Sequence, residues 1–176
     1  MPVSENRVAI RLRWYWQMEA ANAVLLPVLA WLLVAQSGGT MTAAFGASAL
    51  ACAWLLVIGA LYWRAVLRKM QGASGALDYW LPRLAKAEFP SLALVLVAAS
   101  AIALEFAMLG GGWTAARIAA VALATLAALE YVNYYKIQLQ HFDNGADFKR
   151  LITGRGFRKA HMARDIAAWR AAKREN

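Results

Sequence analysis

The chain alternates long apolar blocks with short polar connections. The four apolar blocks cover residues 18–35, 43–63, 91–109 and 114–135. Each is close to the roughly 20 predominantly apolar residues that a helix needs to cross a bilayer. The blocks lack the alternation of a β-barrel, and a spanning helix satisfies its own backbone hydrogen bonds. The pattern therefore predicts an all-α polytopic membrane protein with four transmembrane helices.

The connections between the blocks differ in length and composition. Glycine-rich turns at 37–40 and 110–112 join spans one to two and three to four, whereas spans two and three are separated by a polar loop at 64–90. The predicted organisation has three parts: an N-terminal segment at 1–17, a four-helix bundle at 18–135 and a basic tail at 136–176.

Two polar segments carry apolar residues at helical spacing. The segment Leu77–Lys86 is expected to form a helix along the inner membrane surface that turns into span three at Pro90. The segment Arg158–Lys173 is expected to form a second surface helix, docked either on the bilayer or on the bundle. Both predictions rest on one apolar face surrounded by basic residues.

Charge distribution sets the predicted orientation. The chain has 19 Lys and Arg residues against 10 Asp and Glu, which gives a net charge of +9. All the basic residues except Arg117 lie in the N-terminal segment, the 64–90 loop or the tail. Because cytoplasmic segments carry such an excess, both termini are predicted to be cytoplasmic, in a bacterial plasma membrane.

The basic residues next to the spans are predicted to contact anionic lipid headgroups. The candidates are Arg64, Arg68, Lys69, Arg155, Arg158 and Lys159. Nucleic-acid binding is disfavoured, since the aromatic residues mark the membrane interfaces and are not interleaved with the basic ones.

A polar stripe follows the end of span four. At 100° per residue, Glu130, Asn133, Tyr134, Gln138 and His141 fall within about 140° of one helix face. Polar groups that face lipid are costly, so this stripe is expected to face other helices. It suggests either a proton relay or ion site, or a set of structural hydrogen bonds.

Span one carries a smaller polar pair, Glu19 and Asn22, near the same membrane leaflet. If spans one and four touch, this pair would join Glu130 and Asn133 in one intramembrane cluster. The structural alternative for Glu130 is an ion pair with Arg64 at the end of span two. Which of these applies depends on the order of the helices, which the sequence leaves open.

Other candidate residues have mainly structural interpretations. Glu105 is expected to pair with Arg117 on the adjacent span, and Cys52 is expected to be a packed core residue. The sequence contains no motif for a cofactor or a metal, so none is predicted. Small residues on span two, such as Gly46 and Ala51, are expected to allow close helix contacts.

Three functions fit these features. The favoured one is a non-enzymatic accessory, scaffold or assembly subunit that binds lipid and a protein partner or a second copy of itself. An oligomeric transporter or channel component would use the stripe through Glu130 as an ion path. An enzyme acting on lipid headgroups would use His141 as a base and Asp143 as its orienting acid.

Overall fold

The architecture comes from a computed structural model, which describes residues 7–139 and 158–175. The described residues form five helices and no named strand: α1 (Arg7–Gln36), α2 (Ala43–Met70), α3 (Gly75–Leu109), α4 (Ala115–Tyr135) and α6 (His161–Glu175). Four of them, α1 to α4, are long and apolar enough to cross a membrane. The predicted all-α class with four transmembrane helices is therefore confirmed.

The glycine-rich turns end two of the helices. Gly38 and Gly110 have positive φ values of 72° and 78°, which side chains with a Cβ rarely adopt. Each turn then leads to a threonine that caps the next helix: Thr42 Oγ1 accepts from the Phe45 amide, and Thr114 Oγ1 accepts from the Arg117 amide. Both turns lie at one end of the bundle, which we call the glycine end.

The opposite end, which we call the basic end, is more helical than predicted. Residues 64–90 were expected to form a loop, but α2 continues to Met70 and α3 begins at Gly75. Only residues 71–74 separate the two helices. The residues Leu77–Lys86 are helical as predicted, and they are continuous with span three although α3 contains Pro82 and Pro90.

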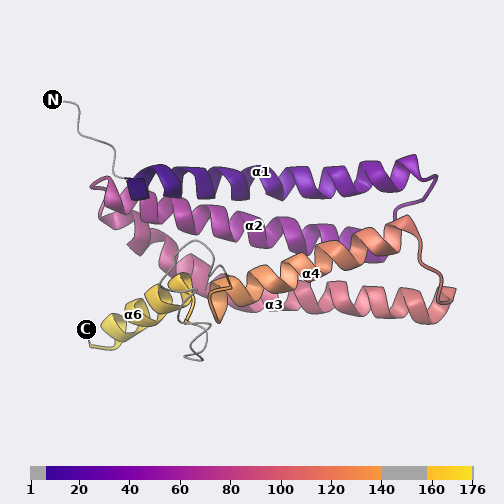
Figure 1. Cartoon of the computed structure of the whole chain (residues 1–176). Helices are drawn as coiled ribbons and strands as arrows, with labels where there is room; N and C mark the ends of the chain where they lie inside the picture. The colour runs from indigo at the N-terminus through magenta and orange to yellow at the C-terminus, as the bar shows by residue number, and fades with distance from the viewer. Residues whose placement is uncertain (1–6, 140–157, 176) are drawn as a thin grey trace, which may run out of the picture.

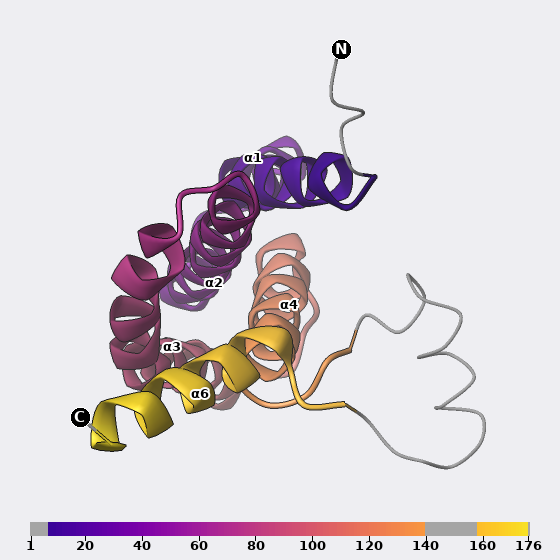
Figure 2. The same cartoon turned by 90° about the vertical axis from the view of Figure 1, so that its left-hand side faces the viewer.

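Helix α2 is the central element of the bundle. It contacts α1, α3 and α4, whereas α1 and α3 lie on its two sides (Figure 1). Viewed along the bundle, α1, α2 and α3 form an arc, and α4 lies on its concave side (Figure 2). The same view shows the first turns of α3 running across the basic end before the helix joins the bundle.

Helix α6 packs on the basic end of the bundle. Met162 and Ile166 are buried there against the core, which settles the choice between bilayer and bundle in favour of the bundle. The Tyr62 hydroxyl of α2 donates to Asp165 Oδ2 at 2.8 Å. An antiparallel bridge between Ile137 and Lys159 joins the segment before α6 to the end of α4.

Glu88 of α3 connects three elements at the surface of this end. Its carboxylate lies 2.9 Å from Lys136 Nζ, just after α4, and 3.5 Å from Arg170 Nη2 of α6. The hydrogen bond to Glu88 raises the pKa of Lys136 above its ordinary value. On the basic side, this ion pair therefore persists at neutral pH and is lost as the pH rises through the raised pKa of Lys136.

The glycine end holds the predicted pair between spans three and four. Arg117 Nε lies 3.2 Å from Glu105 Oε1, and both side chains are almost fully buried. The guanidinium also donates to the carbonyls of Gly110 and Gly112 in the turn between the helices. The prediction that Glu105 pairs with Arg117 is confirmed, and Cys52 is buried in the core as expected.

Candidate functional site

The structure brings polar residues of α1 and α4 together inside the bundle. The Tyr134 hydroxyl of α4 donates to Glu19 Oε1 of α1 at 2.7 Å. On α4 itself, Asn133 Nδ2 donates to Glu130 Oε2 at 3.5 Å, at the limit of a hydrogen bond. Asn133 Oδ1 accepts from the Leu139 amide, which holds the chain just after the helix end. Spans one and four therefore touch through their polar residues.

A glycine in α2 makes this contact possible. A Cβ at Gly59 would lie 2.5 Å from Tyr134 Cζ, closer still to the hydroxyl oxygen, and 3.2 Å from Glu19 Cδ. Tyr134 is buried, so its ring has no room to move aside. Gly59 is thus a part of the site that the sequence did not indicate, because nothing distinguishes it from the other small residues of α2 until its contact with α4 is known. Gly46, by contrast, is exposed and has nothing within 4 Å.

Two acidic side chains and an amide line a partly open cavity between α1, α2 and α4, which we call the inner cavity. Glu19, Asn22 and Glu130 line it together with apolar side chains of α1, α2 and α4. Its volume is about 280 Å³. The Glu19 Oε2 atom is shielded from solvent and has no hydrogen-bond partner among the described residues. Three of the four residues in the predicted cluster thus line one cavity, whereas Asn133 lines a different one.

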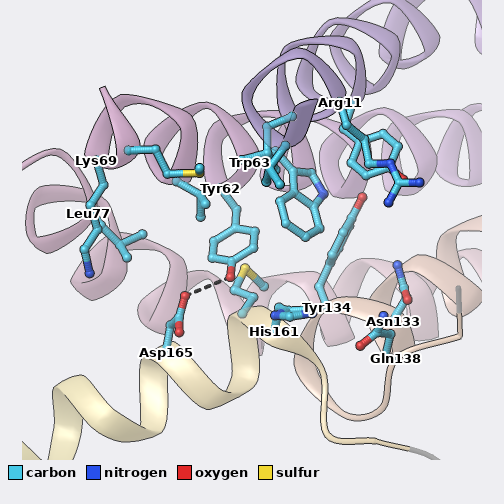
Figure 3. Close-up of a pocket in the computed structure, with 16 residues that line it drawn as sticks. Arg11, Tyr62, Trp63, Lys69, Leu77, Asn133, Tyr134, Gln138, His161 and Asp165 are labelled. Atoms are coloured by element: carbon cyan, nitrogen blue, oxygen red, sulfur yellow. Dashed lines mark hydrogen bonds between the residues drawn. The ribbon is translucent and has the colours of Figure 1, made fainter. Parts of the chain in front are cut away.

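A larger cavity of about 420 Å³ opens at the basic end between α1, α2, α4 and α6. Figure 3 shows its polar lining, with the Tyr134 hydroxyl pointing toward the side of α1 and α2. Asn133, Gln138 and His161 line the same cavity. Tyr15 and Trp63 line both cavities, and their rings lie 5.9 Å apart. We call this the basic-end cavity.

The polar stripe does not continue along a helix as predicted. Helix α4 ends at Tyr135, and Lys136 has a non-helical backbone. The Gln138 amide then donates to the Arg158 carbonyl at 2.8 Å, so the chain pairs with the segment before α6. Gln138 still reaches the same cavity as Asn133, by a different backbone path. His141 lies outside the described residues.

The predicted lipid-contact residues separate onto two faces of α2. Arg64 and Arg68 line two clefts, one shared with Arg13 and Trp16 of α1 and the other with Tyr79 and Trp80 of α3. Their volumes are about 280 Å³ and 350 Å³, respectively. We call the surface formed by Arg13, Arg64 and Arg68 the arginine face. Lys69 instead lines the basic-end cavity.

The remaining basic candidates lie elsewhere. Arg158 and Lys159 are exposed at the approach to α6, whereas Arg155 lies outside the described residues. The guanidinium of Arg64 lies 5.6 Å from the centre of the Trp16 ring on the arginine face. The considered ion pair between Arg64 and Glu130 is not among the salt bridges of the described residues, since Glu130 faces the inner cavity.

Comparison of the chain with protein-family models, with curated proteins and with solved structures finds no match.

Proposed function

We propose that this protein is a non-enzymatic membrane protein that binds anionic lipid headgroups on its arginine face and serves a protein partner as an accessory or assembly subunit. In this proposal it lies in a bacterial plasma membrane with the basic end in the cytoplasm. Lipid binding is proposed because three arginines lie close together on this face: Arg13, Arg64 and Arg68 line one cleft, and Arg64 and Arg68 also line the other.

The chemistry of these side chains suits a phosphate group. A guanidinium donates several N–H groups in a fixed planar arrangement, which matches two oxygens of a phosphate at once. Arg64 lines both clefts together with Arg68, so the two can hold neighbouring oxygens or neighbouring headgroups. The three arginines come from two helices, α1 and α2, and no loop has to be ordered on binding.

Aromatic residues support the placement of this face at the membrane surface. Trp16 borders one cleft, and Tyr79 and Trp80 border the other. Tryptophan and tyrosine favour the headgroup level, where the ring contacts both apolar chains and polar groups. A lipid whose phosphate meets Arg64 would therefore have its chains along the apolar part of α2.

The distribution of charge supports the proposed orientation. The single basic residue at the glycine end, Arg117, is paired with Glu105 and buried. The basic end, in contrast, carries exposed basic residues on α1, α2, α3 and α6. Cytoplasmic leaflets are rich in anionic lipids and cytoplasmic segments are rich in Lys and Arg, so both effects favour the same orientation.

The outer surfaces of α1 and α3 leave room for a partner. Exposed apolar side chains on α1 include Val24, Leu25, Leu29 and Leu33. In a membrane these side chains contact either lipid chains or the helix of another subunit. We propose that a partner or a second copy of the chain covers part of this surface, which co-purification from the native membrane would test.

Removing two of the arginines tests lipid binding directly. We expect Arg64→Gln/Arg68→Gln to weaken binding of phosphatidylglycerol by about 2 kcal/mol, or roughly 25-fold, because each basic residue near the surface contributes about 1 kcal/mol. The measurement is the concentration of phosphatidylglycerol at which half of its effect on the thermal unfolding temperature is reached, with the purified protein in a neutral detergent. Lys173→Gln/Arg174→Gln removes the same charge from α6 and is expected to leave this concentration nearly unchanged. An equal loss in both double variants would contradict a specific site on the arginine face.

A further inference from the structure

The inner cavity contains two carboxyl groups and no basic side chain among the described residues that line it. A charge inside a bilayer is costly, and two like charges facing one small cavity are more costly still. Glu130 has the amide of Asn133 as a distant hydrogen-bond donor, and one oxygen of Glu19 is shielded with no donor among the described residues. The arrangement therefore lacks the counter-charge that two carboxylates would need.

A hydrogen bond joins this cavity to the one at the basic end. Tyr134 lines the basic-end cavity, Glu19 lines the inner cavity, and the Tyr134 hydroxyl donates to Glu19 Oε1 at 2.7 Å. Tyr15 and Trp63 stand between the two cavities and line both. The Tyr134 hydroxyl is therefore placed to pass a proton from one cavity to the other.

We propose that Glu19 and Glu130 form an intramembrane proton-binding site that is loaded from the basic end through Tyr134. In the loading step, Tyr134 gives its hydroxyl proton to Glu19 Oε1 and takes a proton from hydronium in the basic-end cavity, which leaves water there. Tyr134 is neutral before and after the step, and the net result is one proton moved from that cavity to the carboxyl pair. Release follows the same path in reverse.

Several other ionisable groups lie near this path. They are Arg11 and Tyr15 of α1, Cys52, Tyr62 and Lys69 of α2, and His161 and Asp165 of α6. Asp165 accepts a hydrogen bond from Tyr62 and so belongs to the contact between α2 and α6. His161 lines the basic-end cavity, on the side of Tyr134 from which the proton enters.

Infrared spectroscopy of the full chain in lipid nanodiscs tests this site. We expect the carbonyl band of a protonated carboxyl group at neutral pH that disappears reversibly as the pH is raised, and that is lost in Glu19→Gln/Glu130→Gln. Glu88→Gln is the matched control, since Glu88 lies at the surface of the basic end, and it is expected to retain the band. A wild-type spectrum without the band would overturn the proposal, as would a band that survives in the double variant.

The rate of proton exchange tests the path. After rapid mixing with D₂O, Tyr134→Phe is expected to slow the isotope shift of this band by at least about tenfold, because a positioned acid–base group is removed. The ring is retained, so packing against Gly59 is preserved. Tyr135→Phe, which removes the hydroxyl of the neighbouring buried ring that donates to the Leu84 carbonyl, is expected to leave the rate unchanged. Equal rates in Tyr134→Phe and wild type would overturn the role of Tyr134, and loss of the band on adding Na⁺ at constant pH would show a metal-ion site instead.

Discussion

Gly59→Ala is expected to lower the free energy of unfolding by about 3–5 kcal/mol, since it combines overpacking with the loss of the buried hydrogen bond from Tyr134 to Glu19. The added Cβ would lie 2.5 Å from Tyr134 Cζ, and Tyr134 is buried between α1, α2 and α4. The ring can be accommodated only if α4 moves away from α2, which breaks the bond from Tyr134 to Glu19. Unfolding in a mixed detergent, followed by circular dichroism, measures the change.

Gly46 provides the matched control on the same helix. Nothing lies within 4 Å of a Cβ at that position, so Gly46→Ala is expected to be neutral or to stabilise the helix by up to about 1 kcal/mol. Shortening the opposing side chain provides a second check: Tyr134→Ala in the Gly59→Ala background is expected to be less destabilising than the sum of the two single changes. Equal stability of Gly59→Ala and Gly46→Ala would contradict the close approach of α2 and α4.

Glu105→Gln is expected to destabilise the bundle by about 3–5 kcal/mol, because it leaves a buried guanidinium without its counter-charge. The Arg117 side chain is only 6% exposed, and it cannot reach water without leaving the turn carbonyls that it also binds. The same detergent unfolding measurement applies. Replacing both partners, in Glu105→Leu/Arg117→Met, is expected to recover most of the loss, since no buried charge remains.

An exposed arginine on the same helix α3 separates this effect from the loss of any charge. Arg83 is stacked on Tyr79 at the surface of the basic end, and Arg83→Gln is expected to change stability by less than about 0.5 kcal/mol. A loss in Glu105→Gln no larger than that of Arg83→Gln would show that the buried pair contributes little.

The positions of the spans follow closely from the sequence because the membrane imposes a simple rule. An apolar block must be helical throughout, and the predicted starts at residues 18 and 43 fall inside or at the beginning of α1 and α2. The same rule says nothing about polar residues beyond the membrane. The extension of α2 to Met70 and the early start of α3 at Gly75 depend on packing at the basic end, where Leu77 and Leu84 are buried.

The extension of α2 also determines how the basic residues are divided. On a continuous helix, Arg64 and Arg68 are separated by about 40°, whereas Lys69 is about 140° from Arg64. In a loop these three residues would have no fixed relation, so their positions in the sequence predicted a single group. The helix places Arg64 and Arg68 on the arginine face and Lys69 in the basic-end cavity.

The polar cluster was predictable only in part. Helical periodicity placed Glu130, Asn133 and Tyr134 on one face of span four, and the structure keeps them near one another. The partner of Tyr134 depends on which helix lies opposite, and no local pattern in the chain specifies that order. Gly59 is one of several small residues in α2, and only the approach of the Tyr134 ring distinguishes it.

Native mass spectrometry of the tagged protein, extracted from its own membrane in mild detergent, tests the proposed lipid-binding function most directly. The expected result is the chain, alone or with a partner, carrying retained anionic phospholipid that is lost in Arg64→Gln/Arg68→Gln and kept in Lys173→Gln/Arg174→Gln. A wild-type protein that carries no lipid, or that carries neutral and anionic lipids in the proportion of the surrounding membrane, would contradict a headgroup site on the arginine face.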